Sequence, residues 1–168
     1  MRFIVDGMLG SFSRWLRMLG CEVKYFNRAS DDELLDVAKV ESRVLLTRDL
    51  DLFRRAKSHG LEAFFVEGVT EAERLANFSR RFSIKLEVDA STSRCPTCNS
   101  SINRVGKNKV LDRVPPGTLK HYNEFWLCTG CGKVYWRGVH WKNINATLAE
   151  AKKILDGKAN EGFEKTLI

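Results

Sequence analysis

The chain has 168 residues, of which 43% are hydrophobic and 29% are charged, values that are ordinary for one globular domain or two small ones. No apolar run approaches the roughly 20 residues that cross a bilayer, which excludes a membrane-spanning class. The opening residues MRFIVDG reach an acid at position 6, too early for a secretory leader, and we therefore expect a cytoplasmic protein.

The net charge of +7 is confined to one part of the chain. Residues 1–91 contain 15 basic and 15 acidic side chains, whereas residues 92–168 contain 13 basic and 6 acidic ones. Because basic groups displace the counterions that condense on phosphates, this asymmetry favours a nucleic acid as the partner of the C-terminal part. The alternative is that the excess charge serves solubility alone.

The first 82 residues alternate between strand-like and helix-like patterns. Apolar runs predict four strands, at residues 2–5, 22–26, 43–47 and 62–66. Helical spacing predicts four helices, at about residues 9–19, after Ser30, at 52–58 and at 70–82. Glu33 and Glu73 each follow a candidate N-cap, Ser30 or Thr70, by three residues, which is the spacing of a capping box. Such alternation predicts a mainly parallel sheet covered by helices on both faces.

A polar link at residues 89–94 separates this α/β part from one that contains two cysteine pairs. Aromatic strand candidates at 125–127 and 134–136 lie on either side of the second pair, and the residues from about 146 to 155 look helical. We therefore predict an α/β domain at 1–90, a small β-rich zinc module at 91–145 and a helical C-terminal tail at 146–168.

Four of the five cysteines form two Cys-x-x-Cys pairs. The ligands of a single zinc ion are predicted to be Cys95, Cys98, Cys128 and Cys131. Gly130 and Gly132 suit the close backbone approach and positive φ that such turns often need. Since all four positions are taken by protein, we expect the ion to be structural. A dithiol redox pair is the alternative, but it would account for one Cys-x-x-Cys and not for two.

Acidic residues follow three of the predicted strands. The candidate catalytic set is Asp6, Asp31, Asp32, Asp49 and Asp51. Because the C-terminal ends of parallel strands meet at one edge of a sheet, these carboxylates could gather there and hold Mg²⁺ or Mn²⁺. Such an ion can activate a water and stabilise the displacement at a phosphodiester. Each acid also has a local alternative: Asp31 and Asp32 suit a helix N-terminus, and Asp51 suits an N-cap.

Two groups of residues are candidates for contact with RNA. Near the acids in sequence, the candidates for the substrate backbone are Arg14, Arg17 and Arg48. After the second cysteine pair, stacking surfaces and positive charge interleave in Arg137, His140, Trp141 and Lys142. This mixture suits single-stranded RNA, whose bases stack on aromatic rings. The alternative is that Trp136 and Trp141 form the small core of the zinc module.

Several of these motifs, in this order, resemble the Mut-seven C-terminal RNase domain family. Its opening is similar to Asp6–Gly10 and Ser13–Gly20, its next two motifs to Asp31–Leu34 and Leu46–Asp49, and its zinc-ribbon end to Ser93–Cys98, Cys128–Trp136 and Gly138 with His140 and Trp141. The resemblance spans roughly residues 1 to 145. This chain departs from the family pattern at Phe12, where a smaller or aliphatic residue is common, and at Val139, where serine is common.

The resemblance implies a PIN-like three-layer domain fused to a zinc ribbon, with metal-dependent ribonuclease activity. It carries the acidic role onto Asp6, onto Asp31 or Asp32, and onto Asp49. RNA is then the expected partner, and the zinc ribbon is expected to aid its binding. The alternative from a different class is a non-catalytic factor that binds RNA, ribosomal RNA or the ribosome and keeps the fold. No obligatory protein partner is indicated.

Overall fold

The computed structural model describes residues 1–164, with side chains described as far as residue 157. The last four residues of the tail predicted at 146–168 lie outside the described residues. Its first part alternates strands and helices in the order β1 (Arg2–Val5), η1 (Gly7–Leu9), α1 (Gly10–Met18), β2 (Glu22–Tyr25), α2 (Asp31–Val40), β3 (Val44–Thr47), α3 (Leu50–Ser58), β4 (Ala63–Phe65) and α4 (Glu71–Phe82). The four strands form one parallel sheet in the order β2-β1-β3-β4. The predicted α/β class and the parallel sheet are confirmed.

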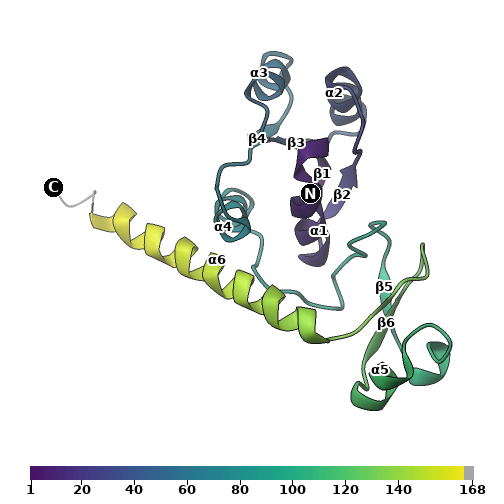
Figure 1. The fold of residues 1–168 in the computed structure, drawn as a ribbon. Helices are drawn as coiled ribbons and strands as arrows, with labels where there is room; N and C mark the ends of the chain where they lie inside the picture. The colour runs from purple at the N-terminus through teal and green to yellow at the C-terminus, as the bar shows by residue number, and fades with distance from the viewer. Residues whose placement is uncertain (165–168) are drawn as a thin grey trace.

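The strands alternate their side chains between two hydrophobic layers. Phe3 and Val5 of β1 face a core that they share with α1 and α4, whereas Ile4 between them faces a second core formed with α2 and α3. All three side chains are fully buried. Figure 1 shows α2 and α3 on one side of the sheet and α1 and α4 on the other. The period of two in the strands thus produces the three-layer arrangement.

Both predicted capping boxes are present at helix N-termini. The Ser30 hydroxyl accepts from the Glu33 amide at the start of α2, and the Glu33 carboxylate accepts from the Ser30 amide. Thr70 and Glu73 make the same reciprocal pair at α4. These bonds satisfy backbone donors that a helix leaves unpaired in its first turn.

The second part is a small antiparallel sheet with two cysteine turns. It contains β5 (Ile102–Val105), η2 (Lys107–Lys109), α5 (Pro116–His121), β6 (Phe125–Cys128) and β7 (Val134–Tyr135), and its strands are ordered β5-β6-β7. We call this part, with the turns at Cys95–Cys98 and Cys128–Cys131, the cysteine module. Its own core is small, with Val110, Val114 and Phe125 at its centre. β6 and β7 match the predicted strands, whereas β5 and α5 were not predicted.

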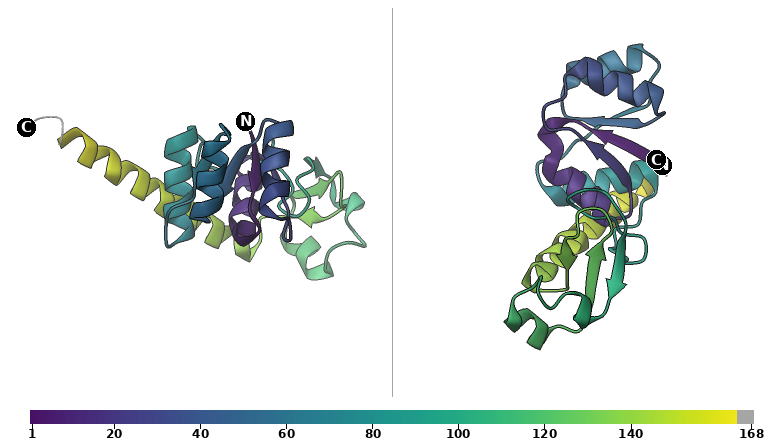
Figure 2. Two further views of the ribbon diagram at one scale, coloured as in Figure 1. Left: turned by 90° about the horizontal axis from the view of Figure 1, so that it is seen from above. Right: turned by 90° about the vertical axis from the view of Figure 1, so that its right-hand side faces the viewer.

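The last helix, α6 (Val139–Glu164), returns the chain to the first part. It begins at Val139 rather than near residue 146 and lies along α4, where Leu148 and Ala151 are buried in the core beneath α1 and α4. Figure 2 shows the two parts joined by this helix, the cysteine module at one of its ends. The C-terminal helix is therefore a packed element of the first part as far as these residues. None of the helices within residues 1–164 is both long and apolar enough to span a bilayer.

Candidate functional site

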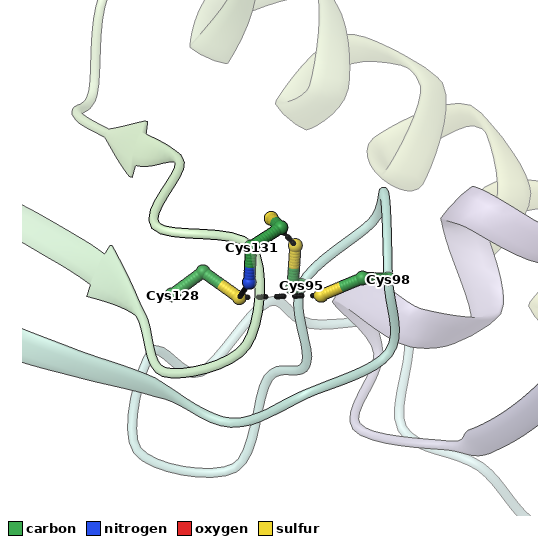
Figure 3. A group of neighbouring side chains, drawn as sticks. All are labelled: Cys95, Cys98, Cys128 and Cys131. Carbon is green, nitrogen blue, oxygen red and sulfur yellow. Dashed lines mark hydrogen bonds between the residues drawn. The ribbon is translucent and has the colours of Figure 1, made fainter.

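Four cysteine sulfurs from two separate turns lie close together. The four Sγ atoms are all within 4.8 Å of one another. Cys95 Sγ is 3.7 Å from Cys131 Sγ, and Cys98 Sγ is 3.3 Å from Cys128 Sγ (Figure 3). A tetrahedral zinc ion with Zn–S bonds of about 2.3 Å has sulfur–sulfur edges of about 3.8 Å. The cluster fits one zinc ion, as the spacing of the two pairs predicted.

The backbone of the second turn is arranged around its sulfur ligands. Cys128 Sγ accepts hydrogen bonds from the amides of Gly130 and Cys131, each at 3.4 Å. A Cβ atom at Gly130 would lie 2.2 Å from Ser100 Oγ and 3.3 Å from Cys98 Sγ, so only glycine lets the two turns approach this closely. Gly132 adopts φ +69°, which side chains rarely tolerate. Both glycine predictions are confirmed.

The thiols differ in how readily they ionise. A hydrogen bond from Ser100 lowers the pKa of Cys98 to about 6, which favours the thiolate that binds metal. Burial raises the pKa of Cys128 to about 12, because the charged form is poorly solvated there. A bound cation would offset that cost and hold the buried sulfur as a thiolate.

Hydrogen bonds hold the first cysteine turn against β2, the edge strand of the parallel sheet. Arg17 is buried, and its guanidinium donates to Val23 O of β2 at 3.0 Å and to Pro96 O and Thr97 O at 3.0 and 3.1 Å. Beside it the Val23 amide donates to Asn99 Oδ1 at 3.1 Å. The sequence suggested Arg17 as a contact for the RNA backbone. The structure instead turns it inward, where it donates to three backbone carbonyls and joins the two parts of the chain.

Two of the candidate acids lie together at the C-terminal edge of the sheet. Asp6 directly follows β1 and Asp49 follows the neighbouring strand β3. The buried Thr47 hydroxyl, at the end of β3, donates to Asp6 Oδ2 at 2.8 Å and accepts from the Asp49 amide at 2.9 Å. Asp6 Oδ1 also accepts from the Met8 amide at 3.4 Å. A single hydroxyl thus binds the carboxylate of Asp6 and the backbone amide of Asp49.

Asp49 also caps the following helix. Its Oδ1 accepts from the amides of Asp51 and Leu52, at 2.8 and 3.0 Å, and leaves Oδ2 without a hydrogen bond among the described residues. The sequence suggested Asp51 as the N-cap, but α3 begins at Leu50, so the cap is Asp49. Asp51 is exposed and lies 3.6 Å from Arg54, one helical turn away.

The two acids that open α2 are held by a basic residue of the adjacent helix. Arg55 of α3 pairs with Asp31 Oδ2 at 3.1 Å and also with Asp32. Within the described part of the chain, the cysteine cluster is the one group of three or more potential ligands that lie close enough to share an ion. The five candidate acids therefore do not gather into one group within the described residues. Thr47 links Asp6 to the Asp49 backbone, whereas Asp31 and Asp32 pair with Arg55.

The two ends of the sheet differ in how their acids are neutralised. At the N-terminal end, the buried Arg43 binds Glu22 and Glu41, each at 2.7 Å, and donates to Phe3 O. The bond from Arg43 lowers the pKa of Glu22. At the C-terminal end, neither Asp6 nor Asp49 has a basic partner among the described side chains. Acids left unpaired at the end where open α/β sheets bind ligands are suited to an external cation.

The candidate RNA-binding residues of the cysteine module are gathered near the start of α6. The Arg137 guanidinium lies 5.4 Å from the Trp126 ring and 5.2 Å from the Trp141 ring, and 3.9 Å from Glu124. His140 and Lys142 are exposed, and Trp141 is half-buried. In the first part, Arg14 and Arg48 are exposed, in contrast to Arg17. These placements leave every candidate except Arg17 open to a ligand.

Sequence reasoning did not identify Thr47, Tyr25 or Asn99. Thr47 was visible as a polar residue at the end of an apolar run and as a member of the Leu46–Asp49 motif, but neither signal gave it a role. Tyr25 donates to Gly7 O at 3.0 Å and so supports the loop after Asp6. Asn99 adopts φ +70°, a conformation that asparagine tolerates better than most residues.

The fold and the clusters define a protein class: a parallel α/β domain whose edge strand β2 is hydrogen-bonded to a module with four clustered cysteines. The chain belongs to the family described as the Mut7-C RNAse domain, whose model matches residues 1–148, and this confirms the resemblance. Comparison with curated proteins and with solved structures finds no match. Family membership suggests a ribonuclease-like role with RNA as the substrate.

Proposed function

We propose that this chain is a divalent-metal-dependent ribonuclease of PIN-like architecture, in which Asp6 and Asp49 hold the catalytic cation. One observation carries the proposal. Asp6 and Asp49 follow neighbouring parallel strands, and one buried hydroxyl, that of Thr47, binds both the Asp6 carboxylate and the Asp49 backbone amide. Neither acid has a basic partner among the described residues. A cation bound between two such carboxylates would be held by opposite charge and by oxygen ligands.

The donor set fits Mg²⁺ or Mn²⁺. Magnesium is usually bound through only one or two carboxylates, with waters and substrate phosphates completing its shell, so a third acid is not required. When bound, such an ion supplies a water of lowered pKa and offsets negative charge on the phosphodiester during hydrolysis. The protein orients the two carboxylates: Thr47 orients that of Asp6, and the capping hydrogen bonds at the start of α3 orient that of Asp49.

The remaining candidates take supporting roles in this proposal. Asp31 and Asp32 act through Arg55, which joins α2 to α3 beside the site, and Asp51 adds negative charge at the same helix start. Arg14 and Arg48 contact the RNA backbone near the acids, while Arg137, His140, Trp141 and Lys142 bind a more distant part of the strand. The zinc ion is structural, because four thiolates leave no open position for a water.

The test is Mn²⁺-dependent cleavage of labelled single-stranded RNA by the zinc-loaded chain. We expect Asp6→Asn and Asp49→Asn each to lower the cleavage rate by roughly a hundredfold or more, since a catalytic cation supplies several kcal/mol of charge stabilisation. Asp36→Asn, an exposed acid on α2, is the matched control and should cleave normally. Equal rates in all three variants would contradict the proposal.

A non-catalytic RNA- or ribosome-binding factor is the second candidate. The observation that favours it is the Arg137 guanidinium between two tryptophan rings, in the part of the chain that carries the whole excess of positive charge. On this account the wild type shows no Mn²⁺-stimulated cleavage, and Arg137→Ala with Lys142→Ala abolishes RNA binding while Asp6→Asn leaves it intact.

A further inference from the structure

A basic groove lies between α1 and the cysteine module. It has a volume of about 450 Å³, within the range of small-ligand sites. Arg14 and Arg17 of α1 form one side, and Thr97, Lys133 and Tyr135 of the module form the other, with Tyr25 of β2 between them. We call it the α1–module groove. It adjoins the cysteine cluster, since the Tyr135 hydroxyl lies 3.0 Å from Cys95 Sγ, and it shares Pro96 and Tyr135 with the pocket beside Arg137.

The charge of this groove is of one sign. Three cations line it, and no carboxylate does. Arg14 is exposed and has no hydrogen bond or ion pair among the described residues. Lys133 is also exposed, and its side chain makes one hydrogen bond among the described residues, to Thr97 Oγ1 at 3.4 Å. The buried Arg17 donates only to carbonyl oxygens, and no carboxylate pairs with it. An anion is the ligand that fits.

The groove leads to the proposed catalytic edge. The Tyr25 side chain lines it, while the Tyr25 hydroxyl donates to Gly7 O, in the residue after Asp6. Tyr25 is also the residue that pairs with Val5, the last residue of β1. A polyanion lying in the groove therefore reaches past Tyr25 toward the carboxylates that end β1 and β3.

We propose that the α1–module groove binds a backbone phosphate of single-stranded RNA next to the bond that is cleaved, with Arg14 and Lys133 as its direct contacts. The proposal rests on the proposed ribonuclease function for the direction of the strand. Tyr25 and Tyr135 add aromatic surface on which an unpaired base can stack. Arg17 is a positioning residue, since its donors are used by the framework.

This assignment makes the cysteine module part of the substrate site. One wall of the groove comes from Pro96 and Thr97, within the first cysteine turn, and another from Lys133, directly after the second. A simpler account is that Lys133 only offsets the formal charge of −2 that four thiolates and one Zn²⁺ carry together. Zinc content and RNA affinity of the same variant separate the two accounts.

The experiment measures the affinity of the zinc-loaded full chain for a short labelled single-stranded RNA, without Mg²⁺ or Mn²⁺. The test variant is Arg14→Ala with Lys133→Ala. The matched control is Lys39→Ala with Lys57→Ala, which removes the same charge from exposed positions on α2 and α3, across the sheet. We expect the test variant to bind roughly tenfold more weakly and the control within about twofold of wild type. The slope of log affinity against log salt should fall by about 1.4, for two lost contacts to a single strand.

Three results would overturn the groove assignment: equal affinity in the test and control variants, loss of zinc from the test variant, or displacement of the RNA by micromolar inorganic phosphate. Cleavage with Mn²⁺ is measured separately. If the wild type does not cleave RNA but its binding depends on Arg14 and Lys133, the groove assignment stands and the ribonuclease proposal is refuted. A wild type that cleaves, together with a test variant that binds like the control, supports the ribonuclease and refutes the groove assignment.

Discussion

Thr47 Oγ1 donates a 2.8 Å hydrogen bond to Asp6 Oδ2 across the boundary between two neighbouring strands. The same oxygen accepts from the Asp49 amide, so a single buried hydroxyl fixes the direction of one acid and the backbone of the other. Replacing Thr47 should therefore affect both the stability of the fold and the cleavage of RNA, and conservative substitutions can separate the two effects.

Replacing Thr47 by valine keeps the shape of the side chain and removes the hydroxyl. We expect a loss of about 1–3 kcal/mol in the free energy of unfolding, because the Asp49 amide loses its acceptor in a part-buried position. Cleavage should fall as well, since Asp6 is no longer oriented. Urea denaturation and the RNA cleavage assay measure the two effects. Thr47→Ser keeps the hydroxyl and should restore most of the activity; a serine variant as inactive as valine would contradict the role given to this oxygen.

Substitutions at Asp49 should separate helix capping from catalysis. Alanine removes the cap of α3 and should lower the free energy of unfolding by about 1 kcal/mol, whereas asparagine is itself a good N-cap and should be close to wild type. Both variants should fail to cleave RNA, because neither carries the charge that holds a cation. Thermal unfolding and cleavage are the two measurements. If the asparagine variant cleaves RNA, Asp49 acts only as the N-cap of α3 and has no catalytic role.

Both capping boxes and the turn within each cysteine pair could be predicted because each depends on residues close together in the sequence. Ser30 and Glu33 meet within one turn of helix, and the two members of each cysteine pair meet within one turn of chain. Local chemistry of this kind is nearly independent of the rest of the fold. The mainly parallel sheet, covered on both faces, could be predicted from the alternation of strand-like and helix-like periods.

Arg17 and the α2 acids show what local patterns do not contain. Arg17 occupies a position where an exposed helix residue was expected, and it is buried because its partners, Pro96 and Thr97, arrive from about 80 residues further along the chain. Asp31 and Asp32 were grouped with the other acids, but Arg55 on another helix pairs with both. In each case the outcome depends on which side chains the tertiary fold brings opposite one another.

The five thiols should react in two groups. Burial in the core of the first part raises the pKa of Cys21 to about 11, so at pH 8 it stays a protonated thiol out of reach of reagents. We expect no reaction with a thiol-specific dye in the zinc-loaded protein, four thiols after chelation and five after denaturation. Counting released chromophore measures this. A Cys21→Ala variant should give four thiols in both of the last two states, and fast labelling of Cys21 in the folded chain would contradict its burial.

Removing zinc should loosen the edge of the parallel sheet as well as the cysteine module. The Val23 amide of edge strand β2 donates to Asn99, one residue after the first cysteine turn, and Arg17 binds the Val23 carbonyl and that turn together. Without the ion this turn has little to hold it, because the core of the module is small. Hydrogen exchange should therefore speed up at Val23 on chelation, while the Val66 amide, which donates to Thr47 O inside the sheet, stays protected.

Asn99→Gly provides the matched variant with zinc still bound. Glycine keeps the positive φ of this position and deletes only the side-chain acceptor, so the Val23 amide should exchange faster while zinc content is unchanged. Chelation of this variant should then add little further exchange at Val23, because the bond through which the module protects that amide is already absent. If Val23 stays protected in the zinc-free wild type, the module is held to the sheet by other contacts, and its zinc ion has no influence on the edge of β2.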